Sequence, residues 1–474
     1  MKKKILVLVS ILFVFALAAF GCGGISLKGG PRYDDTVYGN GGTSVVKGDY
    51  LYFANAYCDY NNLGHNDNKY DAKGELQKKY GIYRTKLNEN GVVSVNSDGV
   101  PTGAELLVPQ VAGHAVSGLY ICGDYLYYVT PFTQETNSGN PNKGRLRFER
   151  VKLDGSDHEI VAGDDGEFNS ECDYSISYIE GVTYITILQD ETLTVYKSKS
   201  NGDVTNYQID SSVDQMVTVE QQKIVYNQTE SEVNKYVYYT KIDSNNFYSL
   251  YKKSLNGGEA TPIITSSEDA IELVNVKNNR VYFKVNSVLK SSTFIGEENI
   301  NTYINQQIVD DATSGIVDYV ILDDTYGYAQ DNGIVVVYFD GSQYNVYKKV
   351  PSSPADLIYT STTQIDILFA TGNEVYFQYK SGDDTKLYSL NILNGVDQVV
   401  INSLNSNIGS DDQTVMNFDY DEDRLFYFAT AENSNGNLQY LHMALLSENI
   451  FEDADGNSVG QYVGVLHSSD IVED

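Results

Sequence analysis

The sequence predicts an all-β fold built from repeated antiparallel units. A tyrosine-rich segment recurs along the chain, and its two clearest copies are GDYLYF at Gly48–Phe53 and GDYLYY at Gly123–Tyr128. The chain has 40 Tyr and 17 Phe, which favour β-strands, and no window places apolar residues at helical spacing over three turns. Four-stranded repeats at this period are typical of a β-propeller, in which each sheet packs face to face on its neighbours.

Each unit has the same order of strands. An alternating first strand turns through a polar pair such as Gly48-Asp49 into the tyrosine-rich second strand. The third strand reads apolar, Tyr, basic, as in LYKKSLNG at Leu250–Gly257, with a variant in FERVKLDG at Phe148–Gly155. Most third strands end in Asn-Gly or Asp-Gly, which accept the positive φ angles of a type I′ turn. Each therefore predicts a hairpin into a short fourth strand, such as HEIV at His158–Val161.

Eight copies of the second strand predict eight blades. They recur at separations of 41 to 75 residues, with equivalent positions at Tyr52, Tyr127, Tyr184, Val225, Tyr282, Val335, Tyr376 and Phe426. Seven blades is the next expectation. The rival interpretation is two smaller all-β domains, because the fifth unit has only a degenerate third strand near Thr302–Gln307, although no Pro-rich or Gly/Ser-rich linker supports a division. We expect the ring to close by blade packing without strand exchange, with Arg32–Tyr38 as the only spare strand.

The strand lettering resembles a known family. Leu-Tyr-Tyr or Val-Tyr-Phe in the second strand and Leu-Tyr-Lys in the third are similar to a bacterial lipoprotein-type β-propeller domain of unknown function, related to the YWTD repeats of low-density-lipoprotein receptors. The resemblance covers about residues 44–466 and implies the fold and a surface or secreted location, but no activity. LYYVT at Leu126–Thr130 is the nearest approach to a YWTD box, and it lacks the Trp and the terminal Asp. The ligand modes of the receptors therefore do not carry over.

Residues 1–21 predict a secretion signal. Lysines at positions 2–4 precede an uncharged apolar run at Ile5–Phe20, which is shorter than a membrane-spanning helix. The segment AFGC, which ends at Cys22, resembles the bacterial lipobox, whose cysteine is lipidated before cleavage. The alternative is an ordinary signal peptide cut after Ala18, which would leave Cys22 as a plain thiol.

Residues 22–43 predict a flexible tether, and residues 44–474 predict the propeller. The tether is rich in Gly and polar residues and lacks a long alternating pattern. With lipid on Cys22, we expect an exported protein at the outer face of the bacterial cytoplasmic membrane. Membrane association then comes from the anchor alone.

The acidity of the chain limits its partners. From Cys22 onward it carries 30 Lys and Arg against 64 Asp and Glu. Nucleic-acid phosphates and anionic membrane surfaces repel such a chain, so nucleic acid is not expected as a partner. The solubility of an exported protein also explains this acidity. We expect a monomer that binds a protein or a glycan.

The cysteine spacing predicts few covalent links. The chain has four cysteines, Cys22, Cys58, Cys122 and Cys172. If lipid takes Cys22, the other three allow at most one disulfide, and none of their spacings matches a metal site. A Cys58–Cys172 disulfide is disfavoured, because the two loops belong to non-adjacent blades.

Motifs for catalysis, cofactors and metals are absent from the sequence. It has no Gly-x-Ser-x-Gly elbow, no phosphate-binding loop and no His-Glu-x-x-His site, and propeller motifs that rely on Trp cannot occur because there is no Trp. None of the five histidines has a second histidine at metal-ligand spacing. The run Asp453–Asn457 looks like half of a calcium loop but lacks the first acidic ligand and the distant Glu, so it predicts a polar turn. We expect no cofactor and no metal.

The order of strands predicts two rims. Connections from the second to the third strand, and from one unit to the next, emerge on one rim, which we call the first rim. Turns from the first to the second strand, and from the third to the fourth, emerge on the opposite rim, which we call the second rim. The second-rim turns are mostly tight, whereas binding residues usually lie on long loops carried by a rigid scaffold. The alternative is neutral insertion, because surface loops tolerate length cheaply. The long first-rim segments are Asn55–Lys79, Thr130–Gly144, Gly163–Asp173, Ser287–Asn301 and Asn402–Thr414.

The first of these loops has the densest set of candidate ligand-binding residues. Six candidates lie in this loop and one, Phe132, lies in the next. The full set is Tyr57, Asp59, Tyr60, His65, Asp67, Tyr70 and Phe132. Aromatic and acidic side chains suit a protein or polysaccharide ligand, so we interpret the chain as a lipid-anchored binding or scaffolding module at the cell surface. The alternative is an extracellular glycan hydrolase or lyase with carboxylates at the central channel. Its candidates are Asp59, Asp173 and Asp318.

Overall fold

The structure is a computed structural model, and all the residues that it describes lie within Asp35–Asp474. The chain divides into Met1–Asp34 and Asp35–Asp474, and the predicted signal peptide and Cys22 lie outside the described residues. In the part that is described, no helix is long and apolar enough to cross a membrane. The described residues are 36–57, 81–97, 101–109, 118–131, 145–169, 172–218, 223–225, 231–233, 235–277, 280–286, 288–293, 301–302, 315–322, 333–350, 354–380, 386–402, 419–421, 423–430, 439–446, 449–453 and 455–464.

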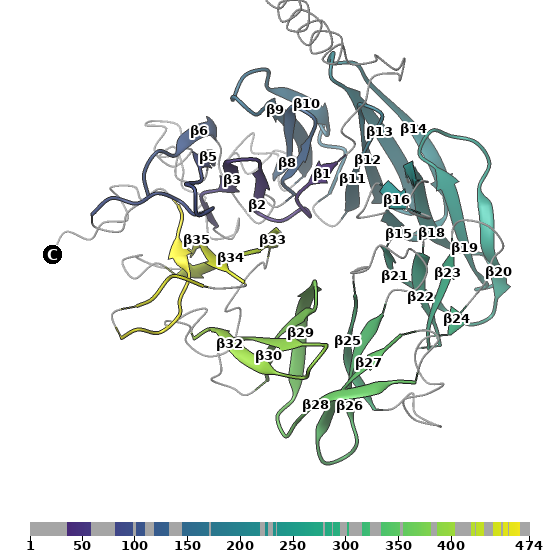
Figure 1. Ribbon diagram of the computed structural model, residues 1–474. Helices are drawn as coiled ribbons and strands as arrows, with labels where there is room; N and C mark the ends of the chain where they lie inside the picture. The colour runs from purple at the N-terminus through teal and green to yellow at the C-terminus, as the bar shows by residue number, and fades with distance from the viewer. Residues whose placement is uncertain are drawn as a thin grey trace, which may run out of the picture. The chain divides into compact units, whose positions relative to one another are not determined.

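Eight antiparallel sheets follow one another around a ring (Figure 1). Each sheet, or blade, has four main strands that we call A to D, with strand A on the inner side of the ring. Blade 1 has β2 (Ser44–Lys47), β3 (Tyr50–Ala54), β5 (Ile82–Lys86) and β6 (Glu105–Val108); blade 2 has β7 (Tyr120–Cys122), β8 (Tyr125–Pro131), β9 (Leu146–Lys152) and β10 (Glu159–Ala162). Blade 3 has β11 (Asp173–Ile179), β12 (Val182–Gln189), β13 (Thr192–Lys199) and β14 (Val204–Ser211); blade 4 has β15 (Val213–Thr218), β18 (Tyr236–Ile242), β19 (Tyr248–Ser254) and β20 (Thr261–Ser267).

The second half of the ring repeats the same order. Blade 5 has β21 (Ile271–Lys277), β22 (Arg280–Val285), β23 (Val288–Thr293) and β24 (Asn301–Thr302); blade 6 has β25 (Ile316–Ile321), β26 (Ile334–Phe339), β27 (Tyr344–Lys349) and β28 (Asp356–Ser361). Blade 7 has β29 (Ile365–Thr371), β30 (Glu374–Tyr379), β31 (Leu387–Asn391) and β32 (Asp397–Ile401); blade 8 has β33 (Asp419–Asp421), β34 (Arg424–Thr430), β35 (Gln439–Leu445) and β36 (Gln461–Tyr462). Four short strands stand outside this order: β1 (Val37–Tyr38), β4 (Ala56–Tyr57), β16 (Lys223–Val225) and β17 (Ser231–Val233).

The predicted eight-bladed β-propeller is confirmed, with one of its eight predicted B-strand positions wrong. Val225 lies in β16, which forms a hairpin with β17 between strands A and B of blade 4. The equivalent residue is Tyr238, because it pairs with Lys252 of strand C as Tyr184 pairs with Lys197 in blade 3. The error arose because the inserted hairpin has the same apolar lettering as a B strand. The third strand of blade 5 was also misplaced, since it is Val288–Thr293 rather than a segment near residue 302.

The turns between strands differ from expectation at one class of hairpin. Gly48 and Gly123 have φ angles of 59° and 57° at the first turn position, as a type II′ turn between strands A and B requires. At the C–D hairpins, type I′ turns were predicted wrongly. In Asp154-Gly155 only the glycine is left-handed, with a φ of 86°, and the Gly155 N–H bonds the carbonyl of Lys152. This is a type I turn followed by a left-handed glycine, which the Asp154 side chain stabilises by accepting the Ser156 N–H at 2.9 Å.

The core consists of eight apolar clusters, one between each pair of neighbouring blades. In β3 the side chains alternate between two of them: Leu51 and Phe53 pack toward blade 8, and Tyr52 and Ala54 pack toward blade 2. All four are less than 5% exposed. A strand buried on both faces loses the polar alternation of an ordinary antiparallel strand, which is why the B strands read as continuous apolar and tyrosine runs.

The ring closes by packing between blades 8 and 1 and by a short strand exchange. The Arg424 Nε donates to the Gly91 carbonyl at 3.1 Å, and the Gln461 Nε2 donates to the Val93 carbonyl at 3.2 Å. In addition β4, which follows strand B of blade 1, pairs with β35 of blade 8. The expectation of closure without strand exchange was therefore wrong in this respect. The spare N-terminal strand β1 joins blade 2 instead of blade 8.

Strand A carries a bulge in each of blades 4 to 7. Beside two of these bulges, in blades 4 and 6, a side chain forms a hydrogen bond with strand A of the next blade. The Gln215 Oε1 accepts the Leu273 N–H of the next blade at 2.7 Å. The Asp318 Oδ2 accepts the Ile367 N–H in the same way, also at 2.7 Å, while its Oδ1 accepts the Tyr319 N–H at 2.8 Å. These bonds tie the inner strands of adjacent blades together.

We predict that Asp318→Ala lowers the free energy of unfolding by about 1–2 kcal/mol, because it leaves the Ile367 N–H and the Tyr319 N–H without acceptors. The midpoint of urea denaturation measures the change. Asp366→Ala is the matched control, since Asp366 is half exposed and faces Lys380 at 4.0 Å; it should cost less than about 0.5 kcal/mol. Equal shifts in the two variants would show that the inner bond is not stabilising.

Candidate functional site

Most of the residues predicted from the sequence to bind a ligand lie outside the described part of the chain. Tyr57 is described only as backbone, in β4. The remaining candidates, Asp59, Tyr60, His65, Asp67, Tyr70 and Phe132, lie outside the described residues. The connections that contain them start and end on the first rim, because they join strands B and C of blades 1 and 2. These ligand residues stay predictions.

The predicted difference in loop length between the rims is smaller than expected. On the second rim, the connection between strands A and B spans 219–235 in blade 4 and 322–333 in blade 6, and the C–D connection spans 87–104 in blade 1. One segment was also assigned to the wrong rim. Ser287–Asn301 contains β23, strand C of blade 5, and the part that follows it joins strands C and D on the second rim. Length alone therefore does not single out the first rim.

The described part of the first rim carries an ordered acidic surface over blades 2 and 3. We call residues Gly163–Asn169 and the turn Asp190-Glu191 the acidic rim segment. The first piece joins blade 2 to blade 3, and the second joins strands B and C of blade 3. Gln189 connects them, since its Oε1 accepts the Asn169 N–H at 2.7 Å and its Nε2 donates to the Glu167 carbonyl at 2.8 Å. The exposed carboxylates are those of Asp164, Asp165, Glu167, Asp190 and Glu191.

Two residues fix the acidic rim segment to the propeller core. Phe168 is 6% exposed, and its ring meets those of Phe148 and Tyr196 edge to face, with centroids 5.6 and 5.7 Å away. Gly163 has a φ of 90°, and a Cβ there would lie 2.5 Å from the Leu146 carbonyl oxygen. Only glycine fits that close approach. The five carboxylates therefore stand on a preorganised backbone, which lowers the entropy cost of binding.

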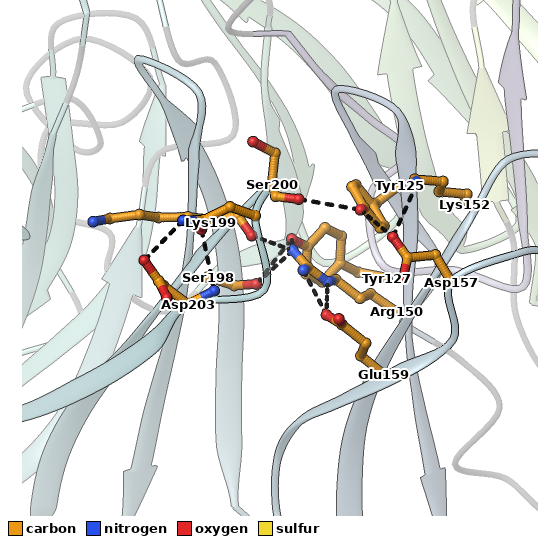
Figure 2. Close-up of polar contacts among 11 residues, drawn as sticks. Tyr125, Tyr127, Arg150, Lys152, Asp157, Glu159, Ser198, Lys199, Ser200 and Asp203 are labelled. Atoms are coloured by element: carbon orange, nitrogen blue, oxygen red, sulfur yellow. Dashed lines mark hydrogen bonds and ion pairs between the residues drawn. The ribbon is translucent and has the colours of Figure 1, made fainter.

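A buried arginine joins blade 2 to blade 3 near the second rim (Figure 2). Arg150 is fully buried, and its guanidinium donates to the Ser198 Oγ at 2.9 Å and to the Lys199 carbonyl at 2.7 Å. Its Nε and second terminal nitrogen donate to the same Glu159 oxygen, at 2.9 and 2.6 Å. The guanidinium also lies 4.2 Å from the centre of the Tyr125 ring. The Arg150 guanidinium is thus surrounded by hydrogen-bond acceptors and by the Tyr125 ring.

The Arg150 cluster is structural, because blade 1 repeats it. Arg84 binds the Glu105 carboxylate of its own strand D at 2.6 and 2.8 Å and the Leu153 carbonyl of the next blade at 2.5 Å. It also lies over the Tyr50 ring, which corresponds to Tyr125. A contact set repeated between successive blades serves the packing of the repeat rather than a single chemical site.

A buried carboxylate on the other face of blade 2 was missed by the sequence analysis. Glu149 has a side chain 2% exposed, and it accepts hydrogen bonds from the Tyr128 hydroxyl at 3.0 Å and from the Arg147 side chain, while pairing with His158. Burial alone would raise the pKa of Glu149, but the hydrogen bond with His158 and the charge of Arg147 outweigh it and hold this pKa below its ordinary value. The usable signal was FERVK, where Glu149 replaces the tyrosine of the third-strand pattern.

The predicted channel carboxylates are not brought together by the described strands. Asp173 is exposed at the start of β11 in blade 3, Asp318 lies in β25 of blade 6, and Asp59 lies outside the described residues. Burial raises the pKa of Asp318, and this outweighs the backbone hydrogen bonds that it accepts. Both oxygens of Asp318 already accept backbone N–H groups. Its carboxylate therefore serves the packing of blades 6 and 7.

No group of three or more His, Cys, Asp or Glu side chains that could hold a metal ion occurs among the described residues. The acidic run Asp453–Asn457 forms the predicted polar turn, since the Asp453 Oδ1 accepts the N–H groups of Asp455 and Asn457 at 2.9 Å. Cys122 and Cys172 are free and buried in the cluster between blades 2 and 3. Burial raises the pKa of the Cys122 thiol to about 12 and that of Cys172 to about 11, so both stay protonated and unreactive.

Comparisons with known proteins assign neither a family nor an activity to this chain. No family model and no curated protein matches the sequence. Similar solved structures include an oligogalacturonate lyase in complex with manganese, with a TM-score of 0.42 and 12% identity over 69% of this chain and 87% of that one. The β-propeller domain of the Trilobed protease from Pyrococcus furiosus has a TM-score of 0.37 and 11% identity over 78% and 96% of the two chains. At such similarity no activity transfers to this protein.

We predict that Arg150→Met lowers the free energy of unfolding by about 2–4 kcal/mol, because Ser198 and the Lys199 carbonyl lose a buried donor. Arg84→Met is the matched control. The side chains of Arg84 and Glu105 are 22% and 63% exposed, so water replaces the lost contacts and the cost should be nearer about 1 kcal/mol. Chemical denaturation of both variants tests this ranking. A smaller loss for Arg150→Met than for Arg84→Met would contradict it.

We predict that Glu149 makes the propeller less stable in acid. Its pKa is lowered in the folded protein, so its contribution is fully present above the pKa of an unfolded Glu, about 4.3, and is lost as the pH falls through the folded value. The stability difference between wild type and Glu149→Gln should therefore shrink as the pH falls below about 4.3. Denaturation midpoints across this range measure it. Asp164→Asn, which removes one exposed acid, is the control for the change in net charge.

Proposed function

We propose that this protein is an exported, lipid-anchored β-propeller of the bacterial cell surface that binds a protein or polysaccharide through its first rim. The proposal keeps Cys22 as the lipid attachment site and the outer face of the cytoplasmic membrane as the location. It also keeps the resemblance to lipoprotein-type propellers related to YWTD repeats. The eight-bladed ring supplies the rigid scaffold for the rim.

The observation that carries the proposal is the acidic rim segment. It exposes five carboxylates on a backbone fixed by Phe168, Gly163 and Gln189, and it adjoins blade 2, whose B–C connection holds Phe132. Carboxylates presented in this way attract amines and accept hydrogen bonds from hydroxyl groups. A protein with a basic face, or a glycan that carries amino or hydroxyl groups, has that chemistry. The aromatic residues predicted in the Asn55–Lys79 connection belong to the same proposal.

The alternative of a glycan hydrolase or lyase receives no support from the described residues. Glu149 is held ionised by its hydrogen bonds, so it cannot donate a proton as the general acid of such an enzyme requires. Asp318 uses both oxygens to bond backbone N–H groups of blades 6 and 7. Binding is therefore the function that we propose.

The bait for finding the partner is the unit Asp35–Asp474, immobilised and exposed to envelope extracts and, in parallel, to a glycan array. It has to include β1, because Val37 and Tyr38 pair with strand A of blade 2. A truncation at residue 43 would remove that strand. Retention of no envelope protein and no glycan by correctly folded bait would contradict the proposed function.

We predict that neutralising the acidic rim segment weakens binding of the captured partner at least tenfold while leaving the fold intact. The variant combines Asp164→Asn, Asp165→Asn, Asp190→Asn and Glu191→Gln. A matched control neutralises four exposed acids of the second rim through Asp49→Asn, Asp124→Asn, Glu89→Gln and Glu259→Gln. Calorimetric titration gives the affinities, and circular dichroism gives the fold. Binding that survives the first variant, or falls equally in the control, would remove the first rim from the proposal.

A further inference from the structure

The N-terminal strand β1 fixes the side from which the chain enters the propeller. It forms an extra inner strand of blade 2, pairing antiparallel with β7 so that Val37 faces Cys122 and Tyr38 faces Ile121. As a strand A, β7 runs from the first rim to the second, which it reaches at Cys122 before the Gly123-Asp124 turn. Val37 therefore lies at the second-rim end of β1. The strand β1 itself is on the inner side of the ring (Figure 1).

The residues after β1 confirm this direction. The Gly118 and Leu119 N–H groups, which precede β7 on the first rim, bond the carbonyls of Gly41 and Gly42 at 2.7 and 3.0 Å. The chain then starts strand A of blade 1 from that same rim. Since the segment 39–43 lies at the first rim, the chain enters β1 at its second-rim end, where Val37 lies.

The length of the tether limits how the anchored propeller can rotate relative to the membrane. Thirteen residues separate Cys22 from Thr36. Fully extended, this segment spans about 48 Å, and as a flexible coil it spans about 20 Å on average. Its average reach is thus similar to the height of the propeller, because β8 and β9 have seven residues each and a seven-residue strand is about 23 Å long.

Facing the first rim toward the membrane would stretch the tether. Along the inner side of the ring the path to the first rim is about 23 Å, which already exceeds the average reach of the tether of about 20 Å. Around the outside, the chain would pass outward across the five strands of blade 2, about 19 Å, and then down its outer edge, about 23 Å. That path of about 42 Å leaves only about 6 Å of a fully stretched tether, so nearly all of its conformational freedom would be lost. With the second rim toward the membrane, the tether needs no stretching.

We infer that the anchored protein holds its second rim toward the membrane and presents its first rim, with the acidic rim segment, outward to partners that are not in the membrane. This inference rests on the proposed lipid anchor at Cys22, and it adds the orientation of the binding surface. A soluble protein or a cell-wall polysaccharide can reach a surface that faces outward. A partner embedded in the same membrane would meet the second rim instead.

The experiment measures the height of each rim above a lipid bilayer. A Cys58→Ser chain that begins at Cys22 is coupled through that cysteine to a maleimide phospholipid in vesicles; Cys122 and Cys172 are buried and do not compete. A donor dye is attached through p-azidophenylalanine at Glu89 on the second rim or at Asp164 on the first rim, both exposed positions. The vesicles carry an acceptor dye on their headgroups.

We expect energy transfer from Glu89 to be about twofold more efficient than from Asp164, because about 23 Å of strand separates the rims. Inserting about 30 Gly/Ser residues between Gly30 and Pro31 should shrink the difference, since a longer tether lets the propeller turn. Equal or higher transfer from Asp164 with the natural tether would overturn the orientation.

The synthetic lipid separates this inference from the proposed function. The orientation is measured whether or not the cell lipidates Cys22, so its failure leaves the native anchor untouched. The native anchor is tested by expressing the full chain with Cys22→Ser, which should move the protein from the membrane fraction to the soluble fraction. A wild-type protein that is already soluble would contradict the anchor, and with it the outward presentation in the cell.

Discussion

Every blade of this protein has to bury both faces of its sheet, and the rest of the structure depends on that double burial. Eight apolar clusters fill the eight interfaces, and the central strands contribute to two clusters at once, as Leu51 and Tyr52 do from adjacent positions of β3. A strand in this position cannot slip by one residue without exchanging the sides of every large side chain. The ring therefore has one register and one order of blades, which makes it a rigid carrier for its loops.

Polar groups near the blade edges add specificity to this packing. Arg84 and Arg150 each bond the strand D carboxylate of their own blade and a backbone carbonyl of the next one. On the inner side, Gln215 and Asp318 bond backbone N–H groups of the following blade. Apolar contacts alone are not directional, so these bonds help to fix how far one sheet is turned against its neighbour. They also explain the burial of the Arg150 charge without a catalytic role.

The two rims of the propeller carry different structural features. The second rim holds the start of β1 and contacts that close the ring between blades 8 and 1, such as that of Arg424 with the Gly91 carbonyl. The first rim holds the acidic rim segment, where Gln189 and Phe168 immobilise a surface that has five exposed carboxylates. The length of the connections does not distinguish the two rims. The position where β1 starts and the fixed backbone of the acidic rim segment do.

The sequence by itself determined the class of fold, the number of blades and seven of the eight B-strand positions, because each depends on local lettering such as GDYLYF that repeats along the chain. It could not place Val225, since an inserted hairpin has the same lettering as a B strand. The candidate site was foreseen only as loops on a rim. Only the tertiary structure decided that Glu149 meets His158, that β4 crosses to blade 8, that β1 enters blade 2 from the second rim, and that Gly91 meets Arg424, 333 positions away. Such pairings depend on competition among many distant segments with similar strand patterns, which no local pattern encodes.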